Sequence, residues 1–246
     1  MSKTLQVYSS LEESAAENMA TDTWCFSEHS RSKRPAFRHY GWKSSCATFG
    51  FGQSYEWVSA ETSFPDEKLC RRPTGGGIVE HGNDWTYSLV IPSACLNSQE
   101  TVAQVYHRVH GEISAAIIAS GIETKLLSCS ESPSLRKSRR TIPGKCFLEP
   151  VPRDVVLARD GKKIAGAAIK KTRAGILLQG TVDQLGLPDA MDWVRFQNLF
   201  LEGIADYLDS SPEPVSWPDD FASARKPYLR QFASEQWLRH RRSIPL

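Results

Sequence analysis

The stretch "RRPTGGGIVEHGNDWTYSLVIP", residues 71–92, constrains the fold of this chain more than any other. Three consecutive glycines, Gly75 to Gly77, let the backbone adopt positive φ and approach a ligand, with N–H groups left to bind a carbonyl oxygen or a phosphate. Arg71 or Arg72 can add a charge-assisted contact. The spacing matches neither the Walker pattern nor the dinucleotide fingerprint. The residues alone therefore leave a ligand-binding turn and a plain glycine-rich hairpin turn open.

The patterns around this turn predict an α+β fold. Strands and helices are interspersed, but the strands come in hairpins, so we expect a mixed, mostly antiparallel β-sheet covered by helices and a single domain over 1–246. The predicted strands are 4–8, 35–42, 46–53, 86–91, 122–127 and a meander over 153–182; the predicted helices follow a capping box of Ser10 and Glu13, then cover 101–120, 189–208 and 221–242. Glycines in 46–53 indicate close backbone approach. The polar, serine-rich stretch 128–145 predicts a mobile loop, and the prolines of 210–220 predict a proline-rich bridge.

Composition excludes several classes of protein. A net charge of +2 gives no electrostatic argument for a nucleic-acid partner. The chain shows no apolar run of about 20 residues and no signal-peptide core, so we expect a cytoplasmic protein without a membrane partner. Its six cysteines contain no CxxC pair, which argues against a zinc ribbon or a disulfide framework; they are Cys25, Cys46, Cys70, Cys95, Cys129 and Cys146.

Two motifs together resemble the biotin/lipoate A/B protein ligase superfamily. The first is "RRPTGGGIVEH" with "TYSLVIP", and the second is "DGKKIAGAAIKKTRAGILLQGTV", residues 160–182. The lipoate branch carries an Arg-Arg-x-Thr/Ser-Gly-Gly-Gly turn, a following histidine and a Lys-Ile-Ala/Ser-Gly-x-Ala segment. The resemblance covers nearly the whole chain and implies a ligase-like catalytic domain, which in this family is a monomer.

Cys146, in "GKCFLEPVPRDVVLARDGKKIAG", resembles the cysteine of the ligase-like octanoyltransferases. ATP-dependent ligases do not need a cysteine at this position. The resemblance implies that Cys146 is the catalytic nucleophile and Lys163 its catalytic partner. A thiolate attacks a thioester without ATP, and a nearby ammonium lowers the pKa of the thiol. Lys163 could later accept a proton from the acceptor amine, and the glycine turn, with Lys163 or Thr74, could hold the oxyanion. We expect Lys162 to point away on the other face of the strand.

The substrate-binding residues that the resemblance implies lie in both motifs. They are Arg71, Arg72, Thr74, Gly75, Gly76, Gly77, His81, Gly166 and Ala167. His81 is either a pocket residue or a loop histidine that caps backbone, and we expect no metal because no second ligand stands at suitable spacing. His107 and His110 are expected at the surface or in helix packing. Without the family match, Cys146 would be read as a buried structural thiol.

The resemblance implies an octanoyltransferase that moves an octanoyl group from acyl carrier protein to a lysine of a glycine-cleavage H protein or a dehydrogenase E2 domain, with no cofactor. The alternatives are a lipoate–protein ligase using ATP and Mg²⁺, an amidotransferase between lipoyl proteins, and a non-catalytic module that binds acylated proteins. We interpret the lack of a C-terminal accessory domain as favouring the transferase. The basic runs 136–140 and 225–242 could dock an acidic carrier or lipoyl domain.

Overall fold

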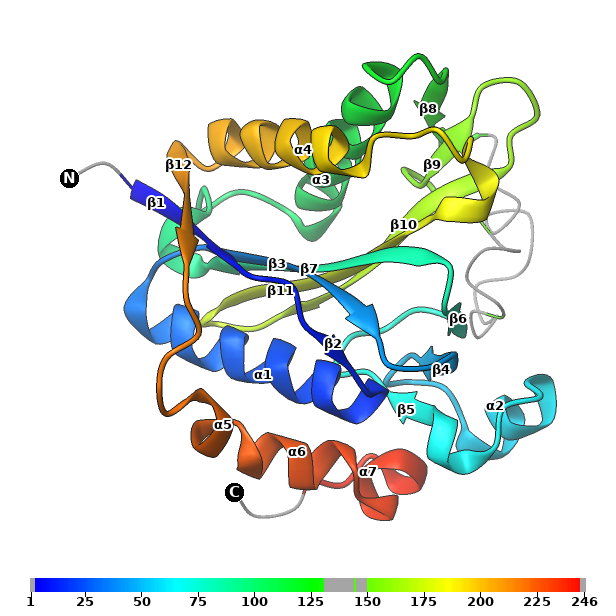
Figure 1. Ribbon diagram of the computed structural model, residues 1–246, viewed down its shortest axis with the longest axis vertical. Coiled ribbons are helices and arrows are strands. Elements are labelled where there is room, and N and C mark those ends of the chain that lie inside the picture. Colours follow the sequence, from blue (N-terminus) through cyan, green and yellow to red (C-terminus); the bar gives the residue numbers. More distant parts are fainter. Residues whose placement is uncertain (1–2, 131–143, 145–149, 244–246) are drawn as a thin grey trace.

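A nine-stranded mixed sheet forms the centre of the protein in the computed structural model, which describes residues 3–130, 144 and 150–243 (Figure 1). Its strands run in the order β12(Ser210–Val215), β1(Lys3–Tyr8), β3(Ala36–Trp42), β7(Asp84–Pro92), β11(Gly175–Asp183), β10(Lys163–Lys171), β9(Val155–Leu157) and β8(Thr124–Leu126), with β2(Glu12–Glu13) beside β3. The pairings from β3 to β8 are antiparallel, and β12, β1 and β2 add parallel ones. The predicted α+β class with a mixed, mostly antiparallel sheet is confirmed.

Helices cover both faces of this sheet (Figure 1). On one face, α3(Val102–Ile118) and α4(Trp193–Tyr207) bury the apolar stripes that their sequences predict, such as Val109 and Phe200, both at 0% exposure. On the other face lies α1(Ala15–Ser32), on which α6(Lys226–Phe232) packs; α5(Phe221–Ala224) and α7(Glu235–His240) flank α6. No helix in the described part of the chain is long and apolar enough to cross a bilayer.

Apolar and polar side chains alternate along β7, so one face of the sheet is apolar here and the other is polar. Trp85, Tyr87 and Leu89 face the main core under α3 and α4, whereas Thr86 and Ser88 point toward α1. Side chains on a strand alternate between faces, so one short sequence contributes both an apolar core and a polar surface. The face toward α1 is therefore the one that can hold buried polar groups.

A small second sheet carries the glycine-rich turn. Its central strand β4(Cys46–Phe49) pairs in parallel with β5(Leu69–Arg71) and antiparallel with β6(Val79–His81), and α2(Tyr55–Glu61) lies beside it. Because β5 and β6 lie on opposite edges of β4, the turn between them does not close a hairpin. A Cβ on Gly50 would lie only 2.1 Å from the Gly76 carbonyl oxygen. The predicted close backbone approach of this segment is confirmed at Gly50.

Helix α1 begins four residues later than predicted. Ser14 is its N-cap, and Glu17 completes the capping box, so the predicted box of Ser10 and Glu13 is wrong. The same Ser-x-x-Glu spacing occurs three times in this segment, at Ser9, Ser10 and Ser14. Glu13 is instead in β2 beside β3, and its carboxylate accepts a hydrogen bond from Thr21.

The predicted proline-rich bridge over 210–220 begins as a strand. β12 pairs in parallel with β1 at the edge of the sheet, with Pro212 opposite Leu5 and Pro214 opposite Val7. Prolines two residues apart present their missing N–H groups to the same side, which an edge strand tolerates because that side needs no partner. The alternation of proline thus fits an edge strand.

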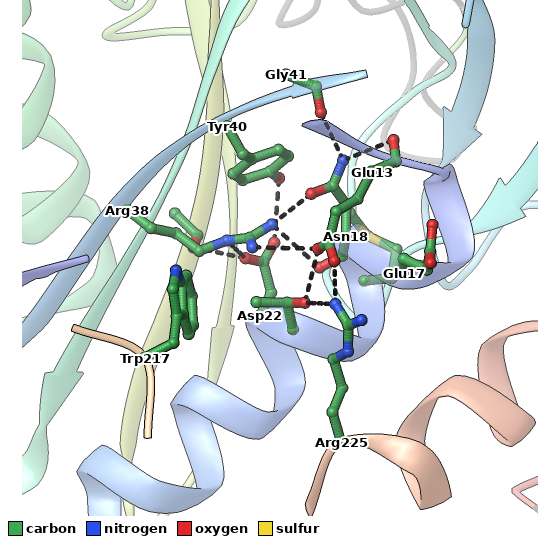
Figure 2. Close-up of polar contacts among 12 residues, drawn as sticks. Glu13, Glu17, Asn18, Asp22, Arg38, Tyr40, Gly41, Trp217 and Arg225 are labelled. Atoms are coloured by element: carbon green, nitrogen blue, oxygen red, sulfur yellow. Dashed lines mark hydrogen bonds and ion pairs between the residues drawn. The ribbon is translucent and has the colours of Figure 1, made fainter. Parts of the chain in front are cut away.

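Arg38 on β3 lies in a buried polar network beneath α1 (Figure 2). Its side chain is 1% exposed; Nε donates to Asp22 Oδ1 at 2.8 Å, and Nη2 donates to Asn18 Oδ1 at 2.6 Å. Nη1 lies 3.7 Å from Glu13 Oε2. Glu13 also binds Arg225 from the C-terminal helices, so the network fastens β3, α1 and the C-terminal segment together.

Asp22 is the centre of this network. Its carboxylate, at 0% exposure, also accepts hydrogen bonds from Ser88 Oγ at 2.6 Å, Gln179 Nε2 at 2.6 Å and Tyr40 Oη at 3.1 Å. A buried carboxylate is tolerated only when its oxygens are paired. One side chain of α1 therefore connects three strands of the sheet.

Replacing Arg38 by Met should lower the free energy of unfolding by about 3–5 kcal/mol, because buried Asp22 then lacks its cation. Urea denaturation measures this. Arg31→Met is the matched control: Arg31 pairs with Glu28 at 3.3 Å while 72% exposed, so its loss should cost no more than about 1 kcal/mol. Equal losses in both variants would contradict a central role for the network.

Candidate active site

A cavity opens on the face of the sheet toward α1, between the glycine-rich turn and strand β10. Its empty space is about 410 Å³, part of it open to solvent. Its lining is mainly apolar with a few polar groups: Met19, Tyr40, Trp42, Thr48, Arg72, Gly76, Val79, His81, Thr86, Gly166, Ala167, Ala168, Gln179, Gly180 and Thr181. The two sequence motifs, about 90 residues apart, thus form opposite walls of one cavity.

Arg72 shapes the glycine-rich turn from inside. Its guanidinium donates to the carbonyl oxygens of Gly75 at 2.9 Å and Gly77 at 2.7 Å, and to Thr48 Oγ1 at 2.8 Å. Gly76 between them has φ +88°, a left-handed conformation that favours glycine. Among the described residues, no hydrogen bond uses the N–H groups of Gly75 to Gly77. The turn therefore holds its carbonyls inward and leaves amide donors for another group.

Arg71 has a different position from Arg72, although both were predicted to bind substrate. Arg71 does not line the cavity; it donates to the carbonyl oxygens of Phe51 at 2.9 Å, Gln53 at 2.6 Å and Leu238 at 2.9 Å. Burial lowers the pKa of Arg71 to about 10. Neighbouring residues of a strand point to opposite sides. Arg71 therefore connects β5 to the loop after β4 and to α7 through hydrogen bonds to their carbonyl oxygens.

Thr74 connects the turn to the network around Asp22. Its hydroxyl donates to Gln179 Oε1 at 2.7 Å, and Gln179 Nε2 donates to Asp22 Oδ2 at 2.6 Å. The Thr74 hydroxyl proton is therefore already used within the protein. Of the predicted oxyanion donors, the glycine-turn amides and Lys163 are the ones that the described geometry favours.

His81 forms part of the cavity wall, with both ring nitrogens hydrogen-bonded. Nε2 lies 2.7 Å from Thr48 Oγ1, Nδ1 lies 2.7 Å from Asp84 Oδ2, and the ring stacks on Trp42 with centroids 3.9 Å apart. Because Arg72 donates to Thr48, the hydroxyl of Thr48 can donate to His81, whose Nδ1–H can then donate to Asp84. Within the described ranges, no group of three or more His, Cys, Asp or Glu residues could hold a metal ion.

Lys163 and Lys162 separate as the strand pattern predicts. Lys162 is 52% exposed and lies 3.3 Å from Asp183. The Lys163 ammonium is buried and lies 2.7 Å from Asp154 Oδ2, also buried. A Cβ on Gly166, a cavity-lining residue, would lie 2.7 Å from Lys163 Nζ. The ammonium is therefore next to the cavity wall, and a side chain at 166 would require it to shift.

Cys146 and most of the loop predicted over 128–145, namely 131–143 and 145, lie outside the described residues. Gly144 before Cys146 and Val151 after it each hydrogen-bond to a residue beside the site. The Gly144 carbonyl oxygen accepts a hydrogen bond from Ile78 N at 3.0 Å, directly after the glycine turn. Val151 N donates at 2.7 Å to Asp154, the partner of Lys163. The assignment of Cys146 as nucleophile stays a prediction.

Several residues of the site were not predicted from the sequence. Asp84 is three residues after His81, a spacing that could have indicated a pair. Asp154 and Tyr106 approach Lys163 only through the tertiary fold. The polar alternation of Thr86 in β7 and of Gln179 and Thr181 in β11 is a local signal that these strands face a polar site.

A glycine-rich turn and a buried lysine on opposite walls of one cavity, on a mixed sheet, define a catalytic domain of the biotin/lipoate ligase type. The model of the lipoyl protein ligase A/B catalytic domain matches residues 14–186. The chain belongs to this family.

Its curated relatives include proteins named octanoyltransferase LipM. Octanoyltransferase LipM of Staphylococcus epidermidis is 29% identical over 189 residues, which cover 74% of this chain and 66% of that protein. Octanoyltransferase LipM of Kyrpidia tusciae is 29% identical over 220 residues, covering 82% and 78%. The match thus spans just under two thirds of the S. epidermidis protein.

Solved structures share the fold at low identity. The bipartite lipoate protein ligase of Thermoplasma acidophilum aligns over 100% of both chains with a TM-score of 0.69 and 15% identity. LipL1 of P. falciparum, in complex with lipoate, aligns over 99% of this chain and 75% of its own, with a TM-score of 0.61 and 12% identity. These likenesses establish the fold.

The charge of Asp84 should make the stability of the protein depend on pH in acid. Burial alone would raise the pKa of Asp84, but His81 and the hydroxyls of Thr181 and Thr86 outweigh it and hold that pKa well below its usual value. Stability from such a carboxyl is present above its unfolded pKa of about 3.9 and is lost as pH falls toward the folded value.

Asp84→Asn should therefore lose less unfolding free energy than the wild type between about pH 4 and pH 2, while being less stable at pH 7. Urea titrations at each pH measure the difference. Asp189→Asn, at an exposed position, is the control and should follow the wild type. An Asp84→Asn acid profile parallel to the wild type would contradict the assigned pairing.

Proposed function

We propose that this protein is an octanoyltransferase of protein lipoylation that works through an acyl-Cys146 thioester and needs no ATP. The observation that carries the proposal is the placement of the Lys163 ammonium and the glycine turn at one apolar cavity, where the described residues leave the amides of the turn unused. Gly144 and Val151, on either side of Cys146 in the chain, hydrogen-bond to Ile78 and Asp154. The names of the relatives support it.

The cavity suits an acyl chain. Met19, Val79 and Ala168 supply apolar surface, and burial of each methylene contributes about 0.8 kcal/mol. The amides of Gly75 and Gly76 can bind the carbonyl oxygen of a thioester, and their donor capacity is not used within the described residues. Cys146 follows two residues after Gly144, whose carbonyl oxygen accepts a hydrogen bond from Ile78 N directly after the turn.

In the first half-reaction, the Cys146 thiolate attacks the thioester carbonyl. The bond between that carbon and the donor sulfur breaks, and the departing thiolate takes a proton from the Lys163 ammonium. The products are acyl-Cys146, a donor thiol and neutral Lys163. We propose acyl carrier protein as the donor.

In the second half-reaction, the acceptor lysine amine attacks the acyl-Cys146 carbonyl. An amide bond forms, the Cys146 thiolate leaves, and Lys163 takes the proton from the attacking amine. The enzyme returns to its initial charge state, so no cofactor is required. We propose a lipoyl domain of an E2 subunit or an H protein as the acceptor.

Incubation with octanoyl carrier protein and no ATP should give an octanoyl adduct that intact mass spectrometry detects and hydroxylamine removes. Cys146→Ser should abolish the adduct, because the hydroxyl is a far weaker nucleophile than a thiolate. Cys129→Ser is the matched control, since Cys129 is an exposed thiol, and it should acylate as the wild type does.

Three other outcomes would overturn the proposal. Acylation of the acceptor that needs free acid and ATP with Mg²⁺, and survives Cys146→Ser, indicates a ligase. Acylation only from an octanoylated lipoyl protein indicates an amidotransferase. No acylation under any of these conditions indicates a module that binds acylated proteins.

A further inference from the structure

The Lys163 ammonium has an anionic partner that the family motif does not contain. Asp154 directly precedes β9, its side chain is 0% exposed, and its Oδ2 lies 2.7 Å from Lys163 Nζ. Burying two charges costs several kcal/mol for each ion before their attraction is counted. The pair lies beside Gly166 in the cavity wall, where a neutral side chain would avoid this cost.

Helix α3 holds the Asp154 carboxylate. Tyr106 Oη donates to Asp154 Oδ1 at 2.5 Å, and the backbone N–H of Val151 donates to Oδ2 at 2.7 Å. The Asp154 carbonyl oxygen accepts from Leu127 N at 2.8 Å. Both carboxylate oxygens and the backbone of this residue are therefore fixed, which fixes the position of the ammonium bound to it.

A second contact from α3 secures the residue before Asp154. Arg153 has φ +73°, a left-handed conformation, and its carbonyl oxygen lies 2.7 Å from His110 Nδ1. Burial lowers the pKa of His110 to about 4, so this ring is neutral at pH 7 and donates through Nδ1. Helix α3 thus determines the backbone of 153–154 as well as the orientation of the carboxylate.

Tyr106 also connects this cluster to the cavity. Its hydroxyl oxygen accepts a hydrogen bond from Ala167 N at 3.2 Å, and Ala167 lines the cavity. Among the described residues, β10 pairs with β9 only at Lys163 and Ala165, and Tyr106 lies at the edge of β10 beyond this pairing. One hydroxyl therefore sets the distance between the cavity wall and the carboxylate that holds Lys163.

We propose that Asp154 is a positioning residue for Lys163, with Tyr106 as its support, and that the pair aims the ammonium at the sulfur atoms exchanged in acyl transfer. This inference rests on the proposed function and deepens it. Asp154 acts through Lys163 alone, so its contribution disappears when Lys163 is absent.

A double-mutant cycle in single-turnover acylation tests this. Asp154→Asn should slow formation of the acyl-Cys146 adduct by about 10–100-fold, as loss of a group that orients a functional side chain does, with the donor KM within about twofold of the wild type. Lys163→Met should be slower still. Adding Asp154→Asn to Lys163→Met should cause no further loss, because the residue through which Asp154 acts is gone.

The neighbouring pair of Lys162 and Asp183 supplies the matched control. Asp183→Asn removes an acidic partner from the adjacent lysine at the surface, and it should leave the rate unchanged. Lys163→Met leaves Asp154 buried and unpaired and could fail to fold; the double variant removes both charges, and urea denaturation shows which variants are native. If Lys163→Met is not native, Lys163→Gln replaces it, because its amide can still donate to Asp154, and adding Asp154→Asn to Lys163→Gln should again cause no further loss.

The outcomes separate this inference from the proposed function. A wild-type adduct together with a wild-type rate in Asp154→Asn overturns the positioning role and leaves the function standing. A further loss when Asp154→Asn is added to a native Lys163→Met protein also overturns it, since Asp154 would then act independently of Lys163. A wild-type protein that forms no adduct overturns the function, and with it this role.

Discussion

The buried carboxylate of Asp22 is the interaction on which the rest of the structure depends. It binds the Arg38 guanidinium at 2.8 Å and accepts hydrogen bonds from Ser88 and Gln179, so one residue of α1 fixes β3, β7 and β11. Through Gln179 it reaches Thr74 at the start of the glycine-rich turn. Asp22 therefore holds both Gln179, which lines the cavity, and Thr74, which begins the glycine-rich turn. The apolar cores lie on the two faces of the same sheet.

The two walls of the cavity differ in the polar groups that they hold. On one side, the Arg72 guanidinium draws the carbonyls of Gly75 and Gly77 inward, and the described residues leave the amides of the turn unused. On the other side, Lys163 is fixed by Asp154 beside Gly166. Polar groups held in place before a substrate arrives need no reorganisation during reaction, which is the main source of electrostatic catalysis. In the proposed mechanism, the glycine turn of the small sheet binds the carbonyl oxygen and Lys163 of β10 transfers the proton.

Much of the fold and part of the site could be predicted from the sequence, because those features are local. Apolar periodicity identifies α3 and α4, and the glycine and lysine motifs each carry their own spacing. Long-range partners leave no such signal: Tyr106 meets Asp154 from 48 residues away. The choice between Arg71 and Arg72 depends on the register of β5, which two identical residues cannot reveal. The start of α1 was wrong because Glu13 is drawn into the ion network instead of a capping box.

The central claim is that an acyl chain lies in the cavity between the glycine turn and β10 while attached to Cys146. A crystal structure of the protein alkylated at Cys146 by a chloromethyl ketone analogue of the octanoyl group tests it most directly. The account predicts the chain against Met19 and Ala168, with the ketone oxygen beside the amides of Gly75 and Gly76. A chain seated outside this cavity, or a ketone oxygen remote from both Lys163 and the turn, would contradict it.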